Sequence, residues 1–193
     1  MTFALVPTHA SFDLITIGNI DRLSPLRDVA LSRHRPIAHL DEDGDSQSAR
    51  NILAARLDRV VADAERRVML VAEGTGCFAA AWWARLTPSS YVSRVAGALF
   101  YAPLTDRLAA NTAQRHFASP HTPLPFPSLL LDDREALSDG DVDALAIGWG
   151  SRPYALIDDA AGPWTRARRM VTRFAARVVE LDTLRADKLR GVR

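Results

Sequence analysis

The stretch VMLVAEGTGCFAAAWWAR, residues 68–85, decides the fold. Its first six residues form an apolar burst that is too short for a helix and typical of a buried parallel strand. Gly74-Thr75-Gly76 then predicts a tight turn, and Cys77–Arg85, which is made of small and aromatic residues, predicts a helix. A strand, a glycine turn and a helix in this order are the setting of a nucleophile elbow.

In a nucleophile elbow the nucleophile occupies a strained turn, and small residues two positions before and after it let the strand and the helix approach closely. A pattern centred on position 74 has Ala72 and Gly76 at the two small positions. The central residue is Gly74, which has no side chain and cannot attack a carbonyl carbon. The backbone device is therefore predicted without its nucleophile.

Similar strand and helix patterns run along the rest of the chain. Further strands are predicted at 3–7, 36–40, 97–102, 128–132 and 153–158, and helices at 24–32, 46–66, 139–147 and 164–189. The apolar segment 12–20 is ambiguous and stays unassigned, and the proline-rich segment 118–127 predicts a crossover loop. Ile52, Leu53 and Leu57 are expected on the buried face of the helix over 46–66. The order predicts one α/β domain over residues 1–193, with about six mostly parallel strands and helices on both faces.

Composition excludes several classes of protein. The chain has 193 residues, 48% hydrophobic and 24% charged, with a formal net charge of +1, as in a soluble globular protein. The low net charge gives no strong overall electrostatic field that would attract nucleic acid or a membrane surface. The one cysteine, Cys77, excludes an internal disulfide. Neither a signal peptide nor a membrane span is apparent, so we expect a cytoplasmic protein.

Several blocks of sequence carry a family resemblance. Val71–Phe78 is similar to the elbow Val-Ala-His-Ser-Leu-Gly-Cys of the YdeN-like serine hydrolases, also called the retinoblastoma-binding serine hydrolase family. With the spacing kept, the likeness continues over residues 80–84, 95–103, 123–128 and 146–150, within a match of roughly residues 66–165. The resemblance implies a single-domain α/β-hydrolase fold.

Carried over residue by residue, the family's catalytic triad is missing from this chain. The serine falls on Gly74, and the aspartate of a Ser-Arg-x-Asp-Pro motif falls on Ala136. The Gly-His-x-Asn loop that carries the histidine is absent, because the chain passes from Asp158 almost directly to Gly162. Three losses imply a domain that no longer performs Ser-His-Asp acyl transfer.

The expected function is therefore binding. We expect a non-catalytic hydrolase-fold protein that binds a protein partner or a small ligand, without a cofactor or metal and without nucleic acid or membrane partners. The expected binding residues surround the former nucleophile and the loop after the first predicted strand: Pro7, Thr8, His9, Glu73, Gly74, Thr75 and Asp133. The alternatives are an esterase-like hydrolase with relocated catalytic residues and a structural subunit of a larger complex.

Three other interpretations of the site residues are weaker. Thr75 as a displaced nucleophile has the large flanking residues Glu73 and Cys77 and no histidine predicted nearby. The family has cysteine at the position of Cys77, which favours a packed structural thiol over a reactive one. Glu73, Asp132, Asp133 and Glu135 are expected at the ends of adjacent strands, where solvated carboxylates are favoured over a cation site because no histidine has ligand spacing.

Two charged segments have ordinary explanations. Asp41–Asp45 is no calcium loop, because Gly44 stands at the fourth position instead of the sixth and Ile52 replaces the bidentate glutamate. Arginines at 169, 173 and 177 form a stripe that is typical of the solvated face of an amphipathic helix, and this interpretation is favoured over nucleic-acid binding.

Overall fold

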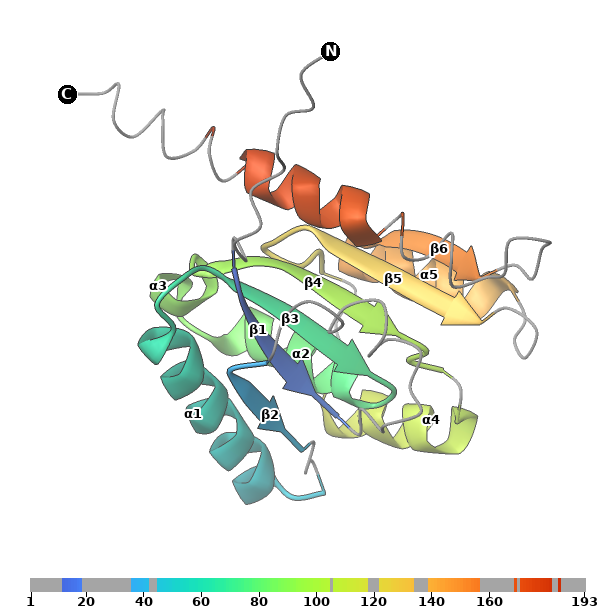
Figure 1. Cartoon of the computed structure of the whole chain (residues 1–193). Helices are drawn as coiled ribbons and strands as arrows, with labels where there is room; N and C mark the ends of the chain where they lie inside the picture. Colours follow the sequence, from blue (N-terminus) through green and yellow to red (C-terminus); the bar gives the residue numbers. More distant parts are fainter. Residues whose placement is uncertain are drawn as a thin grey trace, which may run out of the picture.

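The computed structural model describes residues 12–18, 36–41, 45–104, 106–117, 122–133, 139–156, 169, 171–181 and 184. Its centre is a six-stranded sheet in which every strand pair is parallel, in the order β2-β1-β3-β4-β5-β6. The strands are β1 (Asp13–Ile17), β2 (Ala38–Leu40), β3 (Val68–Glu73), β4 (Val95–Tyr101), β5 (Ser128–Asp133) and β6 (Arg152–Leu156). The α/β prediction with about six parallel strands is confirmed (Figure 1).

The ambiguous apolar segment contains a central strand of the sheet. β1 pairs with β2 on one side and with β3 on the other, and Ile15 and Ile17 are fully buried. Thr16 is the polar residue that obscures this strand in the sequence, and its hydroxyl lies 3.3 Å from the Ala38 carbonyl and 2.8 Å from His39 Nδ1. The predicted strand over 3–7 and the predicted helix over 24–32 lie outside the described residues.

Five helices in the described ranges follow the strands. They are α1 (Gln47–Asp63), α2 (Gly76–Leu86), α3 (Ser89–Val92), α4 (Arg107–His116) and α5 (Asp139–Trp149), and residues 171–181 are also helical. The helices predicted from 46, 77 and 139 are confirmed, the first with Ser46 as its N-cap. The prediction that Ile52 is buried is wrong, because this side chain is 58% exposed while Leu53 and Leu57 face the core. α4 is a helix that the sequence patterns did not predict.

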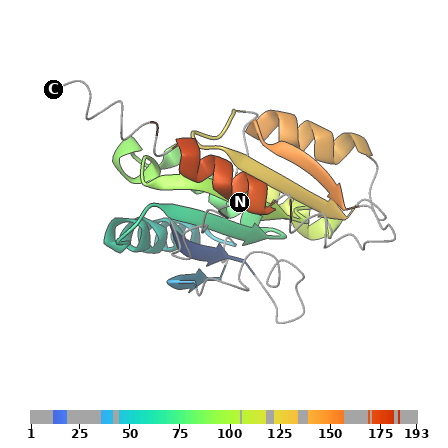
Figure 2. The same ribbon diagram turned by 45° about the horizontal axis from the view of Figure 1, so that its top comes forward.

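The helices cover both faces of the sheet, as predicted. One core contains side chains of α1, α2, α4 and α5, and a second contains Val171 and Val178 from the helix at 171–181. Figure 2 shows this last helix, in red, lying over the middle strands. It approaches β4 closely at Gly97, where a Cβ would lie 3.2 Å from the Val178 side chain and 3.3 Å from that of Phe174.

A close backbone contact joins β1, β3 and α2. Gly18 follows β1 with φ +92°, and a Cβ on it would lie 2.6 Å from the Glu73 carbonyl oxygen. A Cβ on Gly76, the first residue of α2, would lie 2.6 Å from the Ile17 carbonyl oxygen. Both values are far below van der Waals contact, so glycine is required at both positions. After β1 the chain continues to β2 on one side of this strand pair, and after β3 it continues to β4 on the other side. Such a point, where the strand order reverses, is where open α/β sheets bind ligands.

A buried polar contact holds α1 against α2. The Trp83 indole N–H donates a hydrogen bond of 2.7 Å to Asp58 Oδ1, and the Thr87 hydroxyl donates to the same oxygen over 3.2 Å. Trp83 is only 1% exposed. Its donor therefore depends on Asp58 in place of water.

No helix among the described residues is long and apolar enough to cross a membrane.

Gly76→Ala should lower the free energy of unfolding by about 3 kcal/mol, because the new methyl group meets backbone atoms that cannot move aside. Gly140→Ala is the matched control: a Cβ there meets nothing within 4 Å, and alanine favours helices by up to about 1 kcal/mol. Urea unfolding of both variants is the measurement. Equal stabilities would contradict the close contact.

Asp58→Ala should cost about 1–3 kcal/mol, because it leaves the buried Trp83 N–H without an acceptor. Asp63→Ala removes a carboxylate from the same helix that is 72% exposed and paired only with Arg59 at 3.7 Å. That change should stay within about 0.5 kcal/mol. Urea unfolding compares the two, and an equal loss in both variants would show that the bond to Trp83 contributes nothing.

Candidate functional site

The turn between β3 and α2 has the backbone geometry of an elbow. Gly74 lies in the left-handed region with φ +57°, its N–H donates to the Tyr101 carbonyl over 3.0 Å, and its carbonyl accepts from the Cys77 N–H over 3.2 Å. Among the residues that the structure describes, none has an atom within 4 Å of a Cβ built on Gly74. The described part of the chain therefore leaves room for a side chain at this position, at the carboxyl edge of the sheet. Glycine supplies the left-handed conformation without such a side chain.

The N-terminus of α2 is open toward the same edge. Thr75 is the N-cap residue, with helical φ −65° and ψ −23°, and its side chain makes no capping hydrogen bond. The first amides of a helix carry the positive end of its dipole, and those without an acceptor can bind a ligand. In α2 the Cys77 and Phe78 N–H groups already donate to the Gly74 and Thr75 carbonyls. Among the described residues, the start of α2 thus leaves the Thr75 and Gly76 N–H groups without an acceptor, together with the Thr75 hydroxyl.

A cavity of about 330 Å³ lies beside this turn and α4. Its polar lining comprises Asp45, Thr75, Asp106, Thr112 and His116, and its apolar lining comprises Leu108, Ala109, Ala113 and Phe117. We call it the elbow cavity. Leu108, Thr112 and His116 follow each other at four-residue spacing, so one face of α4 forms a wall. Asp106 is fixed as the N-cap of that helix, where its Oδ1 accepts from the Ala109 N–H over 2.9 Å.

The chemistry of the elbow cavity is mixed. Two carboxylates, one imidazole and two hydroxyls share its lining with aliphatic and aromatic carbon. This set can hydrogen-bond a small polar molecule and also cover an apolar part of it. Among the described residues no group of three or more histidine, cysteine, aspartate or glutamate side chains is placed to hold a metal ion.

Of the residues expected to bind, the structure brings Thr75 to the elbow cavity and Gly74 to the turn beside it. Glu73 ends β3, and Asp133 ends β5. Pro7, Thr8 and His9 lie outside the described residues. Ala136 and the segment 157–168, where the sequence indicates that a histidine loop is absent, lie outside them as well.

One expectation about neighbouring strands is wrong. Glu73 and Asp132 do not end adjacent strands, because β4 lies between β3 and β5. Asp132 is also buried, at 2% exposure, so its carboxylate is not solvated as expected. Glu135 lies outside the described residues. His116 lines the same cavity as Thr75, which the sequence did not predict.

Cys77 is fully buried directly after the turn. Its thiol lies 3.4 Å from the Ala72 carbonyl oxygen and 3.6 Å from that of Tyr101, within reach for weak S–H donation. No ligand can reach a fully buried sulfur without movement of the core. The geometry is that of a packed structural thiol.

Asp106, Thr112 and His116 are the site residues that sequence reasoning missed. An available signal was the aspartate ahead of a helix-compatible segment at 107–116, since aspartate is a favoured N-cap. Thr112 and His116 would then fall on one helix face with Leu108. Their place in the lining of a cavity that Thr75 also lines depends on the packing of α4, which no local pattern predicts.

A hydroxyl, an imidazole and a carboxylate are in contact between β1 and the edge strand β2. His39 Nδ1 is 2.8 Å from the Thr16 hydroxyl, and His39 Nε2 is 3.3 Å from Asp41 Oδ1. Thr16 is only 2% exposed, so its oxygen is out of reach of a substrate. This series fastens β2 to β1.

Comparison with known proteins agrees with this geometry. The family model described as serine hydrolase matches residues 30–183, which is most of the chain. The crystal structure of a YdeN-like hydrolase from Pectobacterium atrosepticum superposes with a TM-score of 0.59 at 14% identity, covering 87% of this chain and 92% of that one. An alpha/beta hydrolase fold protein of unknown function gives 0.51 at 10% identity, covering 90% and 89%. No curated protein matches the chain.

The match over residues 30–183 confirms the family resemblance found in the elbow, and the two structures show the fold. The chain belongs to the serine hydrolase family and has the α/β-hydrolase fold.

Proposed function

We propose that this chain is a non-catalytic member of the serine hydrolase family that acts by binding a small ligand or a protein partner. The observation that carries the proposal is Gly74 at the centre of an otherwise complete elbow, where a nucleophile side chain would meet no atom of the described residues within 4 Å. Acyl transfer by this family needs an oxygen nucleophile at that point, beside donors for the developing oxyanion. Here the Thr75 and Gly76 N–H groups at the start of α2 remain as donors, and glycine stands at the position of the nucleophile.

The elbow cavity supports binding of a small ligand in particular. Its volume of about 330 Å³ falls at the lower end of the range for small-molecule sites. The amides at the N-terminus of α2 suit a carbonyl oxygen, and Leu108 and Phe117 suit an apolar portion. A molecule that resembles an ester substrate would be held there without being cleaved.

One specific observation favours a second candidate, a hydrolase with relocated catalytic residues. The Thr75 hydroxyl and the His116 imidazole line one cavity, as a nucleophile and its general base would. Against it, Thr75 has an ordinary helical backbone, whereas the left-handed position of the elbow belongs to Gly74. The non-catalytic function therefore accounts for more of the geometry.

Purified protein should hydrolyse p-nitrophenyl acetate no faster than the same amount of heat-unfolded protein. Gly74→Ser should fold, with a loss of about 1–3 kcal/mol because serine is strained at a left-handed φ. It should remain inactive, because the proposal holds that the family's acid and histidine are also missing. Hydrolysis that appears in Gly74→Ser would show that both partners are in place and would refute the proposal.

Wild-type hydrolysis that is lost in Thr75→Ala and in His116→Gln, while Thr112→Ala keeps it, would establish the second candidate. Thr112 is the matched control because it places another hydroxyl in the same cavity.

Binding at the elbow cavity can be tested with a variant that fills it. Ala109 is half-buried and lines the cavity, so Ala109→Phe should occlude the cavity and leave the turn at Gly74 intact. Affinity purification of both forms from the native organism, followed by mass spectrometry, should find a small molecule or protein with wild type that Ala109→Phe lacks. Identical contents in the two samples would contradict binding at this site.

A further inference from the structure

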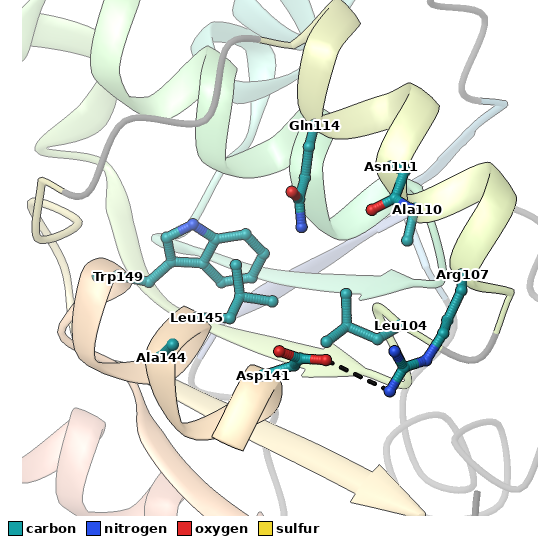
Figure 3. Close-up of a pocket in the computed structure, with 10 residues that line it drawn as sticks. Leu104, Arg107, Ala110, Asn111, Gln114, Asp141, Ala144, Leu145 and Trp149 are labelled. Atoms are coloured by element: carbon teal, nitrogen blue, oxygen red, sulfur yellow. Dashed lines mark ion pairs between the residues drawn. The ribbon is translucent and has the colours of Figure 1, made fainter. Parts of the chain in front are cut away.

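A second cavity, of about 300 Å³, lies between α4 and α5 (Figure 3). We call it the α4–α5 cleft. Its residues from α4 are Arg107, Ala110, Asn111 and Gln114, none of which lines the elbow cavity. The cleft is thus a separate site, outside the proposed function and outside the elbow.

An ion pair crosses the cleft. Arg107 Nη2 lies 3.3 Å from Asp141 Oδ2, and the two side chains are 57% and 58% exposed. Exposed pairs of this kind contribute little to stability, so they separate readily when better partners are offered. The pair therefore presents one positive and one negative group, side by side, to a molecule that enters.

The charges select against singly charged ligands. A monoanion would pair with Arg107 but face the Asp141 carboxylate, and a monocation would pair with Asp141 but face the guanidinium. A zwitterion satisfies both partners with charge-assisted hydrogen bonds and adds no net charge. Its two charged groups must lie close together, because Arg107 and Asp141 do.

The rest of the cleft adds an apolar floor and two amides. Leu104, Leu145 and Trp149 also line the cleft, and Leu104 and Trp149 are buried while Leu145 is half-buried. Asn111 and Gln114 project from α4 toward the same space. The amides can donate to a carboxylate and accept from an ammonium group. The floor suits a short aliphatic or aromatic side chain.

We propose that the α4–α5 cleft binds a free α-amino acid with an apolar side chain. Its carboxylate pairs with Arg107, its ammonium group pairs with Asp141, and its side chain packs on Leu104, Leu145 and Trp149. An α-amino acid carries its ammonium and carboxylate groups on the same carbon atom, which gives the short separation that the cleft requires. Its size fits a cavity of about 300 Å³.

Isothermal titration of the whole chain with L-phenylalanine and L-leucine tests the proposal. L-Phenylalanine should bind at least about tenfold more tightly than N-acetyl-L-phenylalanine, which lacks the ammonium group, and than L-phenylalaninamide, which lacks the carboxylate. Arg107→Gln and Asp141→Asn should each weaken binding of L-phenylalanine by at least about tenfold. Arg115→Gln and Asp143→Asn remove the same charges from α4 and α5 outside the cleft and should keep the affinity.

Four results would overturn the proposal. The first is no heat of binding with either amino acid at about 10 mM, and the second is equal affinity for the blocked analogues. The third is equal weakening in the control variants. The fourth is that Ala109→Phe abolishes binding while Arg107→Gln and Asp141→Asn keep it. The last result would assign the ligand to the elbow cavity. The hydrolysis assay is independent of all four, so this proposal and the proposed function can fail separately.

Discussion

The backbone after β1 and the backbone at the start of α2 meet so closely that there is no room for a side chain at the two contact positions. Gly18 and Gly76 make this approach possible, because a Cβ on either residue would lie only 2.6 Å from a backbone carbonyl oxygen, that of Glu73 or Ile17. The contact fixes where α2 begins, and thereby where the turn at Gly74 and the first amides of the helix stand relative to the carboxyl edge of the sheet. The elbow cavity and the position of α4 beside it depend on that placement.

This joint is a requirement of the fold, whereas position 74 is a requirement of the chemistry, and the two are physically separable. Replacement of Gly76 disturbs packed backbone atoms, but a side chain at position 74 would meet no atom of the described residues within 4 Å. The elbow backbone therefore does not depend on the side chain at its centre. Under the proposed function, this separation is what lets a serine hydrolase scaffold keep its elbow and the cavity beside it without a nucleophile.

Local patterns predict the elements whose signals are unmistakable. β3 has five apolar or small residues followed by Glu73 and a glycine turn, and α1 has a clear buried stripe behind the Ser46 cap. β1 escapes prediction because Thr16 interrupts its apolar run, and the polar group of Thr16 is satisfied only by β2, far along the chain. The expectation that Glu73 and Asp132 end neighbouring strands fails because local periodicity does not determine strand order across a sheet. The placement of His116 and Thr75 on one cavity likewise depends on tertiary packing.

If the chain keeps the elbow of a serine hydrolase without a nucleophile in it, a reagent that traps activated hydroxyls should leave the chain unmodified. The sharpest measurement is the intact mass of the folded protein after incubation with a fluorophosphonate, with an active serine hydrolase in the same vessel to prove that the reagent is competent. The mass of this chain should remain unchanged while the active enzyme gains one phosphonyl group. A single stoichiometric adduct on this chain, lost on prior unfolding and mapped to Thr75 or any other hydroxyl at the elbow, would contradict the absence of a nucleophile.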